Sequence, residues 1–94
     1  MNMMMTTSRP RWTSPVRVRI GYGLPESIRT PEDALSYLEY RWPAVYGEEY
    51  RRAKEACAQA LNGGLPADAA RQAFFQACVE ARMLDEEGGL QLAG

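Results

Sequence analysis

The sequence predicts an α+β domain: an N-terminal two-stranded antiparallel β-hairpin followed by three α-helices, with the second and third helices forming an antiparallel pair. Two observations carry this prediction. Residues 16–20 alternate apolar and charged side chains, which is the period of a half-buried strand. Three segments with apolar residues at helical spacing follow, each bounded by Pro or Gly. Ninety-four residues are enough for one such domain.

The hairpin is predicted from alternation and a turn. Val16, Val18 and Ile20 share one face of the first strand, and Arg17 and Arg19 share the other. Residues 21–25, Gly-Tyr-Gly-Leu-Pro, are typical of a turn. Residues 26–29 are expected to return antiparallel with an inward-facing isoleucine, and helices must cover the apolar face because two strands alone are marginally stable.

The first helix has a clear start and end. Thr30 is a suitable N-cap, Pro31 suits the first helical position, and Pro43 ends the helix at or before Trp42. Taking Leu35 as the centre of the inward stripe places Leu38 and Trp42 within about 60° of it.

Two tyrosines of this helix are predicted to face solvent. Tyr37 and Tyr40 lie about 160° and 140° from the centre of the inward stripe. Tyrosine is common at interfaces because its ring buries area while its hydroxyl keeps a hydrogen bond. The competing interpretation is that both rings lie flat on neighbouring aliphatic groups of a stable monomer.

The second helix is predicted over residues 48–61 and the third over about residues 66–83. Asn62, Gly63 and Gly64 stop the second helix, since they tolerate a left-handed C-cap. Alanines recur every four residues on the third helix, which allows close antiparallel packing of the pair. The third helix is apolar around most of its circumference and is therefore expected to be central.

The predicted buried set joins all of these elements. It consists of Val16, Val18, Ile20, Ile28, Leu35, Leu38, Trp42, Tyr50, Ala53, Cys57, Leu61, Phe74, Ala77 and Ala81. Residues 1–11 are expected to be a disordered arm, residues 12–84 a single domain and residues 85–94 a frayed tail.

Composition argues against several classes of protein. The formal net charge of −1 disfavours a protein built to hold nucleic acid or anionic membrane. No apolar run is long enough to span a membrane, and the first residues lack the pattern of a secretory leader, so we expect a cytoplasmic location. The sequence contains no histidine, and no metal, cofactor, small-molecule or catalytic site is predicted.

Three motifs have a functional interpretation beside a structural one. Cys57 and Cys78 could be a redox pair or metal ligands, but their apolar surroundings favour buried, reduced thiols. The glycines at 21 and 23 could cradle a phosphate, but a strand rather than a helix is predicted next. The two C-terminal helices could be a DNA-reading helix-turn-helix, but the third helix shows no excess of basic side chains.

Arginines gather in the N-terminal third. Residues 1–30 contain five arginines and one glutamate. Arg17 and Arg19 on the outer strand face, with Arg29 beside them, could meet an anionic partner, or they could simply protect an exposed strand edge. We therefore predict a candidate interaction surface made of Tyr37, Tyr40, Arg17, Arg19 and Arg29.

An ordered series of residues resembles a known family. The series is Trp12, Pro15-Val16, residues 30–34 (Thr-Pro-Glu-Asp-Ala), Leu38, Arg41-Trp42-Pro43, Gly47, Tyr50, Ala53, Cys57, Ala60-Leu61, Gly63, Ala70-Arg71, Ala73-Phe74, Ala77 and Ala81. Together these residues resemble the short bacterial proteins grouped as domain of unknown function 982, found mostly in rhizobia-like alphaproteobacteria. The resemblance covers roughly residues 12–82. It implies a compact cytoplasmic domain and transfers no catalytic or binding residue.

Two functional hypotheses follow. The first is a non-catalytic protein-interaction or regulatory module, with a possible homodimer or another protein as its partner. The second is an accessory nucleic-acid-binding protein that uses the basic N-terminal segment, which the net charge disfavours.

Overall fold

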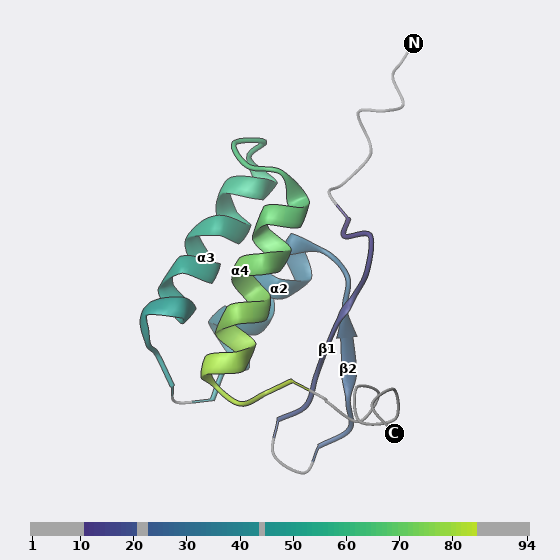
Figure 1. The fold of residues 1–94 in the computed structure, drawn as a ribbon, viewed down its shortest axis with the longest axis vertical. Helices are drawn as coiled ribbons and strands as arrows, with labels where there is room; N and C mark the ends of the chain where they lie inside the picture. Colours follow the sequence, from purple (N-terminus) through teal and green to yellow (C-terminus); the bar gives the residue numbers. More distant parts are fainter. Residues whose placement is uncertain (1–10, 21–22, 44, 85–94) are drawn as a thin grey trace.

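The residues that the structure describes form two strands and three helices, in the order β1 (Val16–Val18), β2 (Glu26–Ile28), α2 (Pro31–Tyr40), α3 (Glu48–Leu61) and α4 (Ala67–Glu80) (Figure 1). The computed structural model describes residues 11–20, 23–43 and 45–84. The predicted α+β class, the hairpin and the antiparallel helix pair are confirmed. The predicted N-terminal arm up to residue 10, the predicted tail and two residues of the predicted turn lie outside the described residues.

The hairpin is shorter than the alternation predicted. β1 pairs with β2 antiparallel, with Val16 opposite Ile28 and Val18 opposite Glu26. Beyond Val18 the chain turns to a different partner, because the Arg19 N–H donates to the Met83 carbonyl at 2.8 Å and Val18 forms an isolated antiparallel bridge with Leu84. The segment after α4 therefore lies along the other edge of β1.

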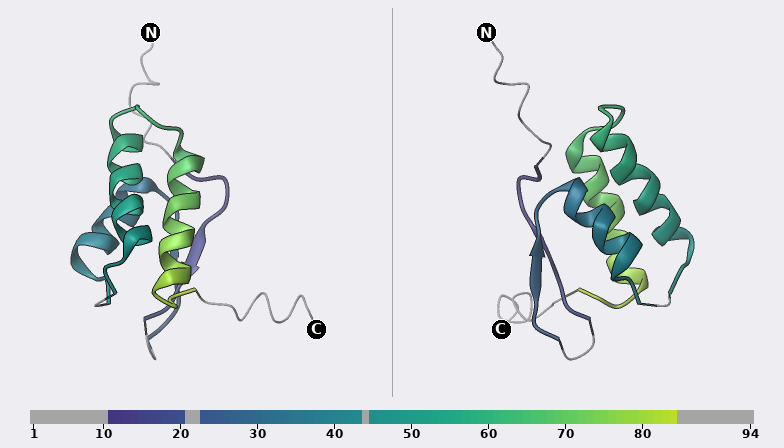
Figure 2. Two further views of the ribbon diagram at one scale, coloured as in Figure 1. Left: turned by 60° about the vertical axis from the view of Figure 1, so that its left-hand side comes forward. Right: turned by 180° about the vertical axis from the view of Figure 1, so that it is seen from behind.

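The helices lie on one side of the hairpin. Figure 2, seen from behind, shows α2 between the hairpin and α3, and Figure 1 shows α4 in the same intermediate position from the front. α4 contacts α3, α2 and β1, as expected for a helix that is apolar around most of its circumference. α3 is the outermost helix and packs on α2 and α4.

Local signals define most helix ends. The Asp33 N–H donates to the Thr30 hydroxyl at 3.0 Å, which confirms the predicted cap of α2. At the end of α3, Gly63 has a φ of 81°, and the Gly64 N–H donates to the Gln59 carbonyl at 2.8 Å. This is the paired hydrogen-bond pattern in which a left-handed residue closes a helix.

α4 ends earlier than predicted for a related reason. It was predicted to run to about Met83 but ends at Glu80. Arg82 has a φ of 58°, and the Met83 N–H donates to the Cys78 carbonyl at 2.8 Å. The same left-handed closure thus occurs here without glycine, and it turns Met83 and Leu84 back toward β1.

The core contains most of the predicted residues. Of the predicted set, Ile20, Leu35, Tyr50 and Ala81 are only partly buried, and Leu61, at the open end of the helix pair, is 37% exposed. The prediction of burial was therefore wrong for Leu61 and too strong for the other four. Three large buried side chains were not in the predicted set: Trp12, Tyr37 and Met83.

The start of α3 depends on a distant side chain. Its N-cap residue, Gly47, offers no side-chain oxygen. Instead, the Glu80 carboxylate at the end of α4 accepts from the Glu49 N–H at 3.3 Å and from the Tyr50 N–H at 3.2 Å. An added Cβ at Gly47 would overlap this carboxylate, so glycine is needed for its close approach.

We predict that Gly47→Ala lowers the free energy of unfolding by about 1–3 kcal/mol, because the methyl group displaces the carboxylate that caps α3. The matched control is Gly64→Ala, where an added Cβ would meet nothing closer than the Gln59 carbonyl at 3.6 Å. Urea unfolding followed by circular dichroism measures both. Equal losses in the two variants would contradict the role assigned to Gly47.

Candidate functional site

The structure separates the residues of the predicted interaction surface. Tyr40 is 80% exposed, as predicted, but Tyr37 is only 5% exposed. The correction follows from the true centre of the inward face of α2, which is Ala34 rather than Leu35. With about 100° per residue, Tyr37 lies about 60° from Ala34 and faces the interior.

Tyr37 packs into a polar cluster between α2 and β2. Arg41 binds the Glu26 carboxylate through two hydrogen bonds of 3.0 and 2.6 Å, and its guanidinium carbon lies 4.5 Å from the centroid of the Tyr37 ring. The Tyr37 hydroxyl donates to the same carboxylate at 3.4 Å. The hydrogen bonds from Arg41 lower the pKa of Glu26, and burial raises the pKa of Tyr37, so the carboxylate is ionised and the phenol protonated at neutral pH. This cluster attaches the end of α2 to the hairpin.

An aromatic hollow lies at the junction of α2 and α3. It has a volume of about 320 Å³. We call it the aromatic hollow, and it is lined by Leu38, Glu39, Tyr40, Trp42, Tyr46 and Tyr50. Tyr40 and Tyr46 are the exposed rings, at 80% and 60%, and Val45 beside them is 40% exposed. Trp42 is buried and belongs to the core as well.

The aromatic hollow is built by hydrogen bonds and ring contacts. The Trp42 indole N–H donates to the Val45 carbonyl at 3.2 Å, which fixes the loop after α2. The Tyr50 hydroxyl donates to the Leu38 carbonyl at 3.0 Å, which joins α3 to the last turn of α2. The Tyr46 ring meets the Tyr50 ring edge-on with centroids 5.0 Å apart, and the Trp42 ring lies 5.9 Å from Tyr50. The floor is therefore rigid and the rim exposed.

Sequence reasoning found only part of this site. Tyr40 was predicted as an interaction residue, but Tyr46 and Val45 were not. The signal was a loop between Pro43 and Gly47 that holds a large aromatic residue next to a predicted core tryptophan. That the two tyrosines face one hollow depends on the angle between α2 and α3, which periodicity does not give.

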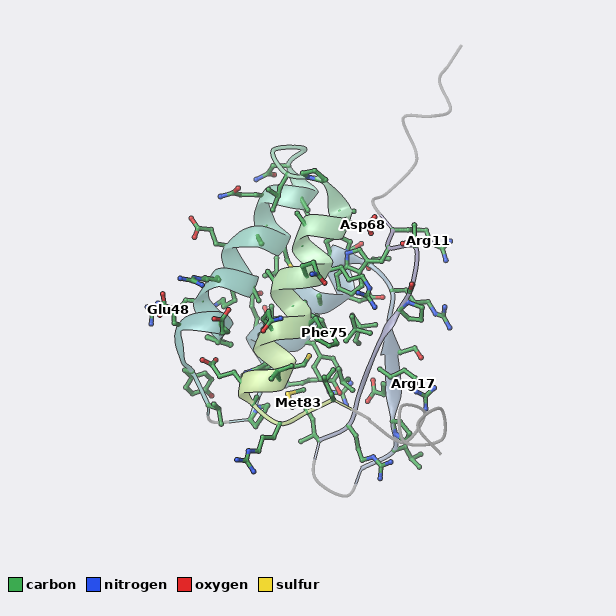
Figure 3. All side chains as sticks on the ribbon, in the orientation of Figure 1. Arg11, Arg17, Glu48, Asp68, Phe75 and Met83 are labelled. Atoms are coloured by element: carbon green, nitrogen blue, oxygen red, sulfur yellow. The ribbon has the colours of Figure 1, made fainter. Side chains whose placement is uncertain are left out.

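The three predicted arginines lie elsewhere. Arg17 and Arg29 are exposed and Arg19 is partly buried on the hairpin. Figure 3 shows Arg17 and Glu48, the first residue of α3, at opposite sides of the molecule. The arginines and the aromatic hollow therefore do not form one continuous surface.

The cysteines are confirmed as buried free thiols. Burial raises the pKa of both Cys57 and Cys78 to about 12, so both are protonated at neutral pH. Cys78 also lines a second hollow of about 430 Å³ with Val79, Arg82 and Leu84. Within the described ranges, no group of His, Cys, Asp and Glu side chains is arranged to hold a metal ion, and no helix is long and apolar enough to cross a membrane.

The phosphate-loop alternative fails on local structure. The Gly23 N–H donates to the Ile20 carbonyl at 2.9 Å, and β2 follows. A phosphate loop needs the free N–H groups of a helix start at this point.

The fold and the site define a small α+β domain in which a hairpin and three helices present an aromatic hollow. The chain belongs to the family described as protein of unknown function (DUF982), whose model matches residues 14–84. The resemblance seen in the sequence is thereby confirmed. Among solved structures, the chain is similar to the protein Atu1219 of Agrobacterium tumefaciens, determined by NMR, with 27% identity and a TM-score of 0.74 over 93% of this chain and 88% of that chain. No curated protein matches the chain.

We predict opposite outcomes for the two tyrosines of α2. Tyr37→Ala lowers the free energy of unfolding by about 3–5 kcal/mol, because it leaves a cavity between α2 and the hairpin. Tyr40→Ala changes it by less than about 0.5 kcal/mol, because the ring is exposed. Urea unfolding measures both, and a large loss in Tyr40→Ala would show that its ring packs against the domain.

The thiols should be inert in the folded protein. Only the thiolate reacts with a disulfide reagent such as dithionitrobenzoate, and burial suppresses both ionisation and access at Cys57 and Cys78. We expect slow labelling of both thiols at mildly alkaline pH and rapid labelling of the same protein in guanidinium chloride. Rapid labelling of either cysteine in the native protein would contradict this placement.

Proposed function

We propose that the domain is a non-catalytic protein-interaction module whose contact surface is the aromatic hollow. The observation that carries the proposal is the exposure of Tyr40 and Tyr46 on the rim of a hollow with a fixed floor. Fixed aromatic side chains suit binding, because their large contact area is ordered at small entropic cost. A cytoplasmic location is part of this proposal.

The chemistry of the polar groups supports binding over catalysis. The ionised groups nearest to the hairpin, Glu26 and Arg41, bind each other and leave neither poised to transfer a proton. The two thiols are protonated and buried at neutral pH, which is unsuited to nucleophilic attack.

Self-association is one form that this interaction could take. The sequence suggested a homodimer through the outer face of α2, with Tyr37 and Tyr40. The burial of Tyr37 removes half of that surface, whereas Tyr40 and Tyr46 provide a replacement. The nucleic-acid alternative stays a prediction, and the packing of α4 on three elements disfavours it as a recognition helix.

Affinity capture with paired variants tests the proposal. The bait is the whole protein, as wild type, as Tyr40→Ser/Tyr46→Ser, and as Leu24→Ser. Leu24 is 85% exposed on the hairpin, so Leu24→Ser removes an exposed apolar side chain away from the hollow. We expect a protein that wild type and Leu24→Ser retain and the double variant loses at least about tenfold, since rim aromatics commonly contribute 1.4 kcal/mol or more to binding, at roughly tenfold each.

The second arm of this experiment measures mass. Equilibrium sedimentation at about 100 μM protein detects a dimer of micromolar to submillimolar affinity. A dimer lost in Tyr40→Ser/Tyr46→Ser identifies a second copy as the partner. Identical captured proteins from all three baits, together with a monomeric mass, would overturn the proposed function.

A further inference from the structure

We propose that the aromatic hollow receives a cationic side chain, an arginine or a lysine, from a segment of the partner protein. This assignment of the partner's chemistry rests on the hollow being the contact surface of the domain. It follows from the rings that line the hollow, from the charges around it and from contacts of the same kind within the chain.

The lining offers aromatic faces to a bound group. Four of the six lining residues are Tyr or Trp, contributed by α2, by the loop that follows it and by α3. The Tyr50 ring stands at the centre of this set, with Tyr46 at 5.0 Å and Trp42 at 5.9 Å from it, and the ring planes are inclined by 61° and 40°. The π-electron faces of such rings carry partial negative charge and attract cations.

The charges around the hollow have the complementary sign. Glu39 contributes a carboxylate to its lining. Leu38, Glu39 and Tyr40 form the C-terminal turn of α2, which has no basic residue and carries the negative end of the helix dipole. Arg41, the next residue, is bound by Glu26 on the hairpin side at 2.6 Å and does not line the hollow.

The chain already makes the same contact twice. The Lys54 ammonium lies 5.4 Å from the centroid of the Tyr50 ring, and the Arg41 guanidinium lies over the Tyr37 ring. Neither cation lines the aromatic hollow. The Tyr50 ring is therefore oriented so that a cation can approach it, while the hollow itself holds none from the described chain.

Other occupants fit less well. An acidic side chain would be repelled by Glu39 and by the C-terminal end of α2. An aliphatic side chain would cover the Glu39 carboxylate without giving it a partner. A guanidinium or ammonium group both stacks on the rings and pairs with the carboxylate.

An NMR titration of the intact protein tests this inference without a partner. The ligands are N-acetyl-arginine amide, N-acetyl-lysine amide and, as the neutral isostere, N-acetyl-norleucine amide. We expect the cations to shift the Trp42 indole N–H signal and the Tyr46 signals, with dissociation constants on the order of millimolar for so small a ligand. The norleucine derivative should bind at least about threefold more weakly, in keeping with the modest strength of an exposed cation–π contact.

Variants locate the effect in the hollow. Tyr46→Ser should weaken arginine binding at least about fivefold, and Glu39→Gln about two- to fivefold with loss of most of its dependence on salt. Glu55→Gln on the exposed side of α3 removes one carboxylate that does not line the hollow and should leave the affinity unchanged. Thermal unfolding of each variant confirms that it is folded.

The outcomes separate this inference from the proposed function. Equal affinity for the arginine and norleucine derivatives, or equal weakening by Glu39→Gln and Glu55→Gln, would overturn the choice of a cation even if capture finds a protein partner. Selective binding of the cations with no captured partner and no dimer would instead retain the ligand chemistry and overturn the protein-interaction function.

Discussion

The Phe74 ring is the contact on which the remaining structure depends. It is completely buried on α4 and meets the rings of Trp12 at 5.7 Å and Trp42 at 5.8 Å. Trp12 lies just before β1, and its N–H donates to the Arg29 carbonyl beyond β2 at 2.9 Å. Trp42 follows α2 and forms part of the floor of the aromatic hollow. One aromatic stack therefore positions the hairpin, the end of α2 and the candidate site together.

Two charged side chains of α4 complete this arrangement by binding backbone rather than other charges. Arg71 donates to the Ser14 carbonyl at 2.7 Å and to the Pro15 carbonyl at 3.2 Å, just before β1. Glu80 caps α3 at the other end of the same helix. Charge-assisted bonds to backbone groups are stronger than neutral ones, so α4 holds the chain on both sides of it.

The fold could be predicted because its signals are local. The alternation of residues 16–18, the Thr30 cap and the glycines after α3 each act within a few residues. The same local logic failed for Tyr37, because only the hairpin determines which face of α2 turns inward. A helix with alanine at 34 and leucines at 35 and 38 is compatible with either rotation. The contact of Tyr37 with Glu26 and Arg41, which accompanies the observed rotation, joins residues from two elements.

The candidate site was harder to predict for the same reason. Tyr40 could be placed on the outer face of α2 by counting residues, but the aromatic hollow needs the packing of α2 against α3. That packing depends on Glu80, which lies 31 residues after the N–H of Glu49 that it binds. Likewise, no local pattern marks Met83 as buried, because its burial follows from the left-handed turn at Arg82.

The bridge between Val18 and Leu84 has a consequence for the order in which the chain folds. α3 and α4 are joined by a short turn, so their contacts form with a small loss of chain entropy and on a fast timescale. The bridge instead brings together residues from the two ends of the described chain. Its contribution to stability arrives only after the helices have brought these ends close. The edge of β1 that Leu84 covers is therefore the last part of the sheet to be protected, and the first to open when the native protein fluctuates.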